Sequence, residues 1–209
     1  MEAKQWNAYT ISYLRYPCLM FFILPAILFL DQGGIAQSSE KAKKVIIQPL
    51  GNIPAQYVDH VKKRIAALIP AVEVQPAIPL PSRAYYKPRG RYRADSLIKI
   101  MASNTADGNV TIGITIEDIS CTNGQYPDWG VFGLSYCPGK ACVASSFRSK
   151  SNQAEGLFET AIHELGHTQG LDHCPDKNCI MQDAEGHNIR AKKFCLKCKK
   201  YLVFKGWML

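Results

Sequence analysis

Residues 163–173 read HELGHTQGLDH, and this stretch decides how the rest of the chain is interpreted. On a helix, His163 and His167 are four residues apart, so both imidazoles lie on one face and can bind one metal ion. Gly170 is expected to end that helix, because glycine tolerates the left-handed backbone conformation, and His173 then returns as a third ligand. Three neutral imidazoles with one open coordination position are typical of a catalytic zinc ion.

Glu164 lies beside these histidines near the open position, which makes it the candidate general acid/base. With 5 His and 15 Gly in the chain, the five fixed positions of this motif are expected by chance about once in 10⁵ such chains. Histidines that merely cap a helix or line a core are the alternative, and the isolated His60 and His187 are interpreted in that way. The motif predicts a zinc-dependent peptidase that uses an activated water.

Four cysteines follow the motif as two close pairs. Cys174 comes directly after His173 and Cys179 five residues later, whereas Cys195 and Cys198 form a CLKC pair. Two pairs about 15 residues apart are typical of a tetrahedral four-thiolate zinc site, which would hold together a segment with little core of its own. A pair of disulfides is the alternative, and an exported protein would favour it.

The joined motifs HELGHTQGLDHC, Cys179, Met181 and the later cysteine pair resemble the archaemetzincins, a family of metzincin-clan metalloproteases. The resemblance runs from about Val45 to Lys200 and is strongest after Val110. It implies a catalytic zinc on the three histidines, Glu164 as base and a turn at Met181 beneath the metal. It also implies a structural zinc on the four cysteines, and therefore two zinc ions per chain. The segment GVFGLSYCPGKACVASSFR resembles the family's edge-strand region.

Hydrophobic periodicity predicts alternating strands and helices. Apolar or alternating runs predict strands at 44–50, 72–74 and 109–119 and a hairpin from 131–136 and 141–147. Helical spacing predicts helices at 54–70, 97–104 and 157–170. Residues 78–93, rich in proline and arginine, are expected to form a loop. We therefore expect an α/β fold with a mixed, twisted sheet of four or five strands, packed helices, the zinc helix and a small zinc-stapled C-terminal subdomain.

The chain has 25 Lys+Arg against 17 Asp+Glu, a formal charge of +8. The excess lies in two clusters, which are Arg83, Lys87, Arg89, Arg91 and Arg93, and Lys192, Lys193, Lys197, Lys199 and Lys200. Both are interpreted as solvated segments, so we expect a monomer without a nucleic-acid partner. Two other functions stay open: a catalytically inactive zinc scaffold, and a zinc-ribbon module that binds nucleic acid or protein. The zinc-ribbon module would give Glu164 no role.

The N-terminus is expected to carry a targeting signal. Lys4 and Arg15 precede an apolar run from Pro17 to Leu30, which is shorter than the about 20 residues of a membrane span and typical of a signal peptide. We expect residues 1–36 to be a signal peptide cleaved after Ala36 or an uncleaved signal-anchor, a buried helix being the alternative. The protein would then be exported or membrane-anchored. A cytoplasmic location is the alternative, because thiolate zinc sites are more typical of reducing compartments.

The remaining domain boundaries follow. Residues 37–44 are expected to be a linker, 45–209 the metallopeptidase domain, and 174–200 its zinc-cysteine subdomain.

An extended peptide or protein substrate is expected to pair its backbone with an exposed strand at Val143, Ala144 and Ser145, since such pairing needs no particular side chain. Cys121, Cys137 and Cys142 lie outside the motif. Cys137 and Cys142 flank a turn and are either a disulfide or plain buried thiols.

Overall fold

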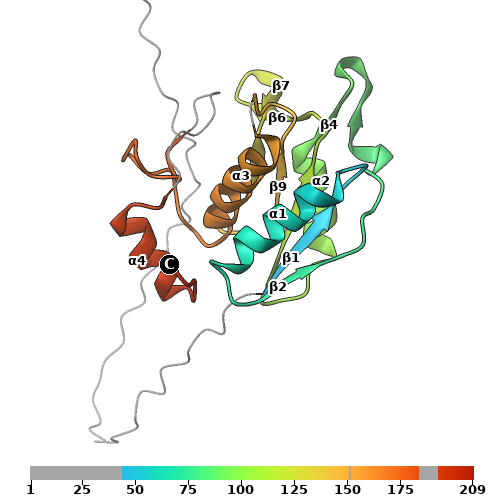
Figure 1. Ribbon diagram of the computed structural model, residues 1–209. Coiled ribbons are helices and arrows are strands. Elements are labelled where there is room, and N and C mark those ends of the chain that lie inside the picture. Colours follow the sequence, from blue (N-terminus) through green and yellow to red (C-terminus); the bar gives the residue numbers. More distant parts are fainter. Residues whose placement is uncertain (1–43, 151, 184–192) are drawn as a thin grey trace, which may run out of the picture. The chain divides into compact units, whose positions relative to one another are not determined.

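The computed structural model describes residues 44–150, 152–183 and 193–209 (Figure 1). The expected signal peptide or anchor at 1–36, the linker up to residue 43 and His187 lie outside the described residues, so what was inferred for them stays a prediction. Within those three described ranges, no helix combines the length and apolar character that crossing a bilayer requires.

The core of the fold is a five-stranded sheet in the order β2-β1-β5-β9-β8. Its strands are β1 (Lys44–Pro49), β2 (Val72–Val74), β5 (Asn109–Thr115), β8 (Gly133–Ser135) and β9 (Ala141–Ser145). All neighbouring pairs are parallel except β8 with β9, which are antiparallel. Because β8 is the last strand in the order, it is an edge strand. The predicted mixed sheet, its central strand near residue 110 and the hairpin that follows are confirmed.

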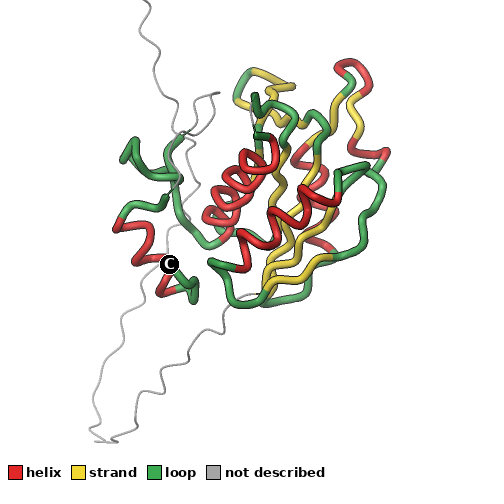
Figure 2. Tube along the Cα trace, in the orientation of Figure 1, coloured by secondary structure: helices red, strands yellow, loops and turns green. Residues whose placement is uncertain are grey.

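Helices cover both faces of this sheet (Figures 1 and 2). They are α1 (Ala55–Ala66), α2 (Ala94–Ser103) and α3 (Gln153–Thr168). Side chains alternate across a strand, and in β9 Cys142 and Ala144 pack in the cluster that contains α1 and α3, whereas Ala141 and Val143 pack in the cluster that contains α2. A sheet covered on both faces explains why β5 and β9 are buried at nearly every position, including the polar Thr111, Thr115 and Ser145.

A second, four-stranded sheet was missed by the sequence analysis. Its order is β3-β4-β6-β7. The strands are β3 (Tyr85–Tyr86), β4 (Arg91–Arg93), β6 (Ile119–Asn123) and β7 (Tyr126–Val131), with short 3-10 turns at Ser82–Ala84 and Lys87–Arg89. The expected single strand at 109–119 is therefore wrong, because the chain leaves the first sheet after Thr115 and enters the second at Ile119. The expected loop at 78–93 is also partly wrong, because β3 and β4 lie within it.

Ion pairs between strands and loops hold this second sheet. Arg91 Nε lies 3.0 Å from Asp118 Oδ2, and Arg148 Nη2 lies 2.6 Å from Asp118 Oδ1. Arg91 and Arg93 both approach Asp128, and their side chains are only 13% and 17% exposed. The interpretation of the first basic cluster as solvated is therefore wrong for these two arginines. Short strands bound by charges carry no apolar alternation, which explains why periodicity did not indicate them.

The C-terminal segment packs on the same core as α3. Its helix is α4 (Leu196–Phe204). Cys198, Leu202 and Trp207 are buried in the cluster that contains α1 and α3, and the Met208 backbone N–H donates to the Leu68 carbonyl at 2.8 Å. The segment is thus anchored both through its cysteines and through apolar contacts.

Candidate active site

The end of α3 is shaped by Gly170, as the sequence predicts. Gly170 has φ +98°, its N–H donates to the His167 carbonyl at 2.8 Å, and the Leu171 N–H donates to the Gly166 carbonyl at 3.2 Å. These two bonds form a Schellman motif, in which a left-handed glycine satisfies the last carbonyls of a helix and turns the chain. The turn sends residues 171–173 back alongside the helix.

Backbone carbonyls orient the two histidines of α3. His163 Nδ1 donates to the Ile180 carbonyl at 2.7 Å, and His167 Nδ1 donates to the Leu171 carbonyl at 2.6 Å. Burial lowers the pKa of His163 to about 4 and lowers the pKa of His167 as well, so both imidazoles are neutral near pH 7. A neutral imidazole has one proton, and here each proton is on Nδ1.

This tautomer leaves two lone pairs facing each other. His163 Nε2 and His167 Nε2 are 3.0 Å apart, and neither has a proton to donate to the other. Two acceptors so close repel each other unless they share a cation. The residues present therefore fit a metal ion. At zinc sites, a ligating histidine usually donates its other ring N–H to a carbonyl or carboxylate, which fixes its tautomer.

His173 completes the group. Its ring centroid lies 5.5 Å from that of His163 and 4.8 Å from that of His167, and one ring nitrogen of each histidine lies within 4.8 Å of the others. His173 is exposed, and its Nδ1 lies 3.5 Å from Asp183 Oδ2. The structure therefore brings together all three histidines of the motif, with one side open to solvent.

Glu164 lies against the edge strand β8. Ser135 Oγ donates to Glu164 Oε2 at 2.7 Å. A Cβ atom at Gly133 would come within 2.6 Å of Glu164 Oε1, so only glycine leaves room for this carboxyl group. Burial raises the pKa of Glu164, and the nearby His167 and the Ser135 hydrogen bond oppose that shift. The carboxyl group is thus held by a strand far from it in sequence.

Met181 lies beneath the motif, in a turn. It is fully buried, and its carbonyl accepts a 2.7 Å hydrogen bond from the Cys174 N–H. A Cβ atom at Gly166 would lie 2.5 Å from Met181 Sδ. The glycine between the two histidines of HELGH is therefore needed for this close approach of the turn to α3.

Replacing Gly166 with alanine tests that contact. We expect Gly166→Ala to lower the free energy of unfolding by about 1–2 kcal/mol, because overpacking against Met181 outweighs the gain in helix propensity. Chemical denaturation measures the change. Gly156→Ala in the same helix is the control, since its Cβ would meet only the Ser149 side chain, whose hydroxyl can rotate away. Equal stability of the two variants would contradict the proposed packing.

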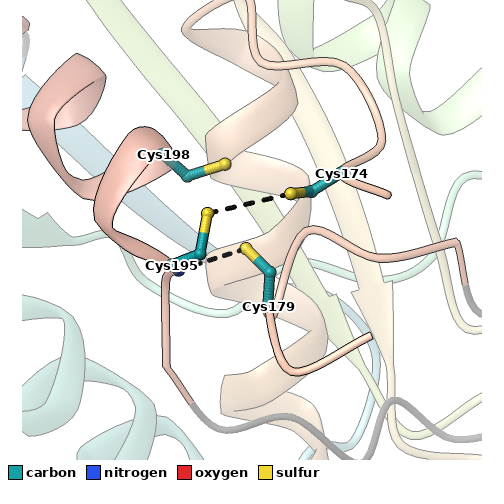
Figure 3. Close-up of side chains that lie close together, drawn as sticks. All are labelled: Cys174, Cys179, Cys195 and Cys198. Atoms are coloured by element: carbon teal, nitrogen blue, oxygen red, sulfur yellow. Dashed lines mark hydrogen bonds between the residues drawn. The ribbon is translucent and has the colours of Figure 1, made fainter. Parts of the chain in front are cut away.

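The four cysteines of the C-terminal motif point toward one another (Figure 3). Their Sγ atoms all lie within 4.8 Å of one another, and those of Cys174 and Cys195 are 3.8 Å apart. A tetrahedron with zinc–sulfur bonds of about 2.3 Å separates its sulfur atoms by roughly 3.8 Å. A disulfide needs about 2.05 Å between two sulfurs and leaves no reason for all four to converge. The arrangement fits one four-thiolate metal site.

Backbone N–H groups favour thiolates in this cluster. The Cys195 N–H donates to Cys179 Sγ at 3.3 Å, and a hydrogen bond from the Cys198 backbone lowers the pKa of Cys195. Burial raises the pKa of Cys179 and of Cys198. Because buried thiols resist ionisation, a cation among the sulfurs is the element that would stabilise four thiolates together.

Among the described residues, the cysteines outside this cluster are Cys121, Cys137 and Cys142, and all three are free thiols. Cys142 is fully buried in β9, and burial raises its pKa well above the ordinary value. Cys137 is half-buried, and its Sγ lies 3.4 Å from the Leu171 carbonyl. Of the two alternatives for Cys137 and Cys142, the structure has the unbridged thiols.

The expected substrate-pairing strand at Val143, Ala144 and Ser145 is wrong. These residues belong to β9, which is paired with β5 on one side and β8 on the other, and all three are at most 1% exposed. Their backbone has no free edge. The strand beside Glu164 that has a free edge is β8, the other strand of the same hairpin.

Sequence reasoning missed the residues that support the site. Ser135 and Gly133 were seen only as part of an edge-strand segment, and the carbonyls of Leu171 and Ile180 carry no side-chain signal at all. Gly166 offered the one usable clue, since a glycine inside a helix lowers helix propensity and indicates close packing.

Known proteins resemble the whole described fold. The profile described as Peptidase family M54 matches residues 56–203. The archaemetzincin of Methanopyrus kandleri is 32% identical over 162 residues, covering 73% of this chain and 90% of the relative. The archaemetzincin of Halobacterium salinarum is 33% identical over 156 residues, covering 66% and 85%.

Solved structures agree with this result. The crystal structure of the Methanopyrus kandleri archaemetzincin has a TM-score of 0.65 at 28% identity, covering 82% of this chain and 98% of that chain. The archaemetzincin of Archaeoglobus fulgidus, complexed with malonate, has a TM-score of 0.64 at 27% identity, covering 76% and 99%. The chain therefore belongs to peptidase family M54, the family of the archaemetzincins, and is a zinc metallopeptidase.

Proposed function

We propose that His163, His167 and His173 bind one catalytic zinc ion and that Glu164 is the general acid/base of peptide-bond hydrolysis. One observation carries the proposal: the Nε2 atoms of His163 and His167 are 3.0 Å apart while both Nδ1 protons are held by carbonyls. The buried Glu164 follows the first of these histidines directly in α3. We further propose a second, structural zinc on Cys174, Cys179, Cys195 and Cys198, which gives two ions per chain.

The residues divide the chemistry among them. A zinc ion on three neutral imidazoles supplies Lewis-acid chemistry, acidifying a water molecule and polarising the scissile carbonyl. Glu164 accepts the proton of that water and delivers it to the departing amine. The Ser135 hydroxyl holds Oε2 of Glu164, which leaves Oε1 to carry the proton. Burial supports proton uptake, because it raises the pKa of this carboxyl group.

The substrate is proposed to extend along β8. This strand is the edge of the sheet next to Glu164, so a peptide can add to it through backbone hydrogen bonds. Gly133 presents no side chain at the point where Glu164 approaches the strand. A scissile carbonyl on this edge can therefore come close to the proposed base without displacing a side chain.

Chelation of the metal tests the proposal as a whole. The purified chain is incubated with a library of peptides before and after treatment with a chelator, and its zinc content is measured in parallel. We expect two zinc ions per chain and cleavage that stops on chelation and returns with added zinc. Two bound ions without any cleavage would indicate the inactive scaffold. A single ion with salt-sensitive nucleic-acid binding would indicate the zinc-ribbon module.

Ser135→Ala tests how Glu164 is held. A hydrogen bond to a charged group contributes about 1.5–3 kcal/mol, so we expect kcat/KM to fall on the order of 10- to 100-fold at neutral pH. Losing a donor to the carboxylate raises the pKa of Glu164, which moves the acid limb of the pH–rate profile to higher pH. Ser149→Ala, in the loop between β9 and α3, is the control for the same chemical change away from Glu164. An unshifted acid limb in Ser135→Ala would contradict this role for the hydroxyl.

A further inference from the structure

Helix α4 exposes large apolar side chains on the side opposite its buried face. Cys198 and Leu202, four residues apart, are buried. Leu196, Val203 and Phe204 are 68%, 47% and 79% exposed. A surface this apolar on a short helix is unusual for a segment that only meets water.

The exposed residues form one stripe with lysines around it. At 100° per residue, Leu196, Val203 and Phe204 fall within one arc of about 100°, and Lys200 lies inside the same arc. Lys197 and Lys199 lie on its two flanks. We name Leu196, Lys197, Lys199, Lys200, Val203 and Phe204 the α4 face. The outer face of α4 is thus mixed, with apolar side chains on both sides of Lys200 and a lysine on each flank, and both apolar and cationic side chains take part when a helix binds a membrane interface.

The charged side chains of the C-terminal segment itself are all positive. Residues 193–209 contain five lysines and no Asp or Glu. Lys205 Nζ lies 5.9 Å from the ring centroids of both Tyr201 and Phe204, which brings a further positive charge to the aromatic end of the stripe. Of the second basic cluster, the described Lys193, Lys197, Lys199 and Lys200 are exposed, as expected, and the last three lie among apolar side chains.

The composition of the α4 face selects its partner. A second copy of the chain would bring lysines against lysines, which is unfavourable. A single-stranded nucleic acid would pair with the lysines but would leave Leu196 and Val203 without a role, since bases stack on aromatic rings. An anionic lipid surface satisfies both parts, because lysines reach the headgroup phosphates while their stems and the apolar side chains enter the acyl boundary.

We propose that the α4 face docks the peptidase on the surface of an anionic lipid bilayer. Leu196, Val203 and Phe204 enter the interface, and Lys197, Lys199 and Lys200 contact lipid phosphates. Cys198 joins the inner side of α4 to the four-cysteine cluster and to the core that contains α3. The proposal does not depend on catalysis by Glu164.

Hydrogen exchange of the α4 peptide tests the docking in the full chain. The protein is titrated with vesicles of phosphatidylcholine alone and with vesicles of phosphatidylcholine and phosphatidylserine. We expect α4 to be protected by the anionic vesicles only. The apolar run at 17–30 is present in every sample, so any contribution it makes to vesicle binding is common to all variants and controls.

Two sets of variants separate charge from apolar contact. The triple change Lys197→Gln, Lys199→Gln and Lys200→Gln should raise the lipid concentration needed for half-protection on the order of 100-fold. Phe204→Gln alone should raise it on the order of 10-fold. The controls are a triple change of the exposed Lys62, Lys63 and Lys99 to Gln, and Trp129→Gln on β7, neither of which should shift the titration. Unchanged zinc content verifies that each variant is folded.

Several results would overturn the proposal. Exchange of α4 that is the same with and without anionic vesicles would do so, as would equal protection by the neutral vesicles. Protection that rises with protein concentration in the absence of lipid would assign the α4 face to a second copy. Protection by single-stranded RNA but not by vesicles would assign it to nucleic acid.

Discussion

Glu164→Gln lowers kcat by about 10²- to 10⁴-fold, the contribution typical of general acid–base catalysis, and leaves the zinc content unchanged. Glutamine has the shape of glutamate and can still accept the Ser135 hydroxyl, so the packing against Gly133 is preserved. It cannot take a proton from water, and the proton transfer is lost with it. Steady-state cleavage of a peptide identified from the library measures the rate, and elemental analysis measures the zinc.

Glu73→Gln is the matched control for this prediction. Glu73 lies on β2, the outermost strand at the edge of the sheet opposite β8, where it pairs with Lys44. The same chemical change there should leave kcat within about twofold. If Glu164→Gln cleaved peptides as fast as the wild type, Glu164 would not be the general base. A Glu164→Gln protein without zinc would attribute the lost rate to the metal instead.

Cys179→Ser has the second large effect, because it opens the four-cysteine cluster. We expect the variant to retain less than one zinc ion per chain and to lose at least several kcal/mol of stability, since structural zinc contributes on the order of 10 kcal/mol in zinc-finger peptides. The catalytic site should weaken as well. Its His163 is oriented by the Ile180 carbonyl next to Cys179, and Cys174 directly follows His173.

Cys121→Ser provides the comparison. Cys121 is also buried, but it lies in β6 and outside the cluster, so both zinc ions should remain. Thermal unfolding with a chelator or with a reductant then separates the metal site from the disulfide alternative. A chelator should destabilise the wild type and a reductant should not. Retention of two zinc ions by Cys179→Ser would contradict the four-thiolate site.

Local spacing explains why the convergence of the three histidines was predictable from the sequence. His163 and His167 are one helical turn apart, Gly170 marks the end of the helix, and Cys174 adjoins His173, so all of these relations are short-range. The strands of the first sheet were also predictable, because most of their buried side chains are apolar. These local patterns were sufficient to predict that the three histidines lie close together.

Contacts between distant segments explain what could not be predicted. Ser135 reaches Glu164 across 29 residues, and the Ile180 carbonyl reaches His163 across 17. Neither contact has a periodic signal. The second sheet depends on Asp118 and Asp128 meeting arginines from other segments, and charged residues were interpreted as solvated. The substrate strand was placed on β9 rather than β8, because both strands of a hairpin look alike in sequence.

A crystal structure of the zinc-loaded protein with anomalous scattering measured at the zinc edge tests the central claim most directly. We predict one peak about 2.0–2.1 Å from a ring nitrogen of His163, of His167 and of His173, and a second about 2.3 Å from four cysteine sulfurs. Imidazoles that point apart, or a metal-replete protein without a peak among the three histidines, would contradict the catalytic zinc site and the function proposed from it.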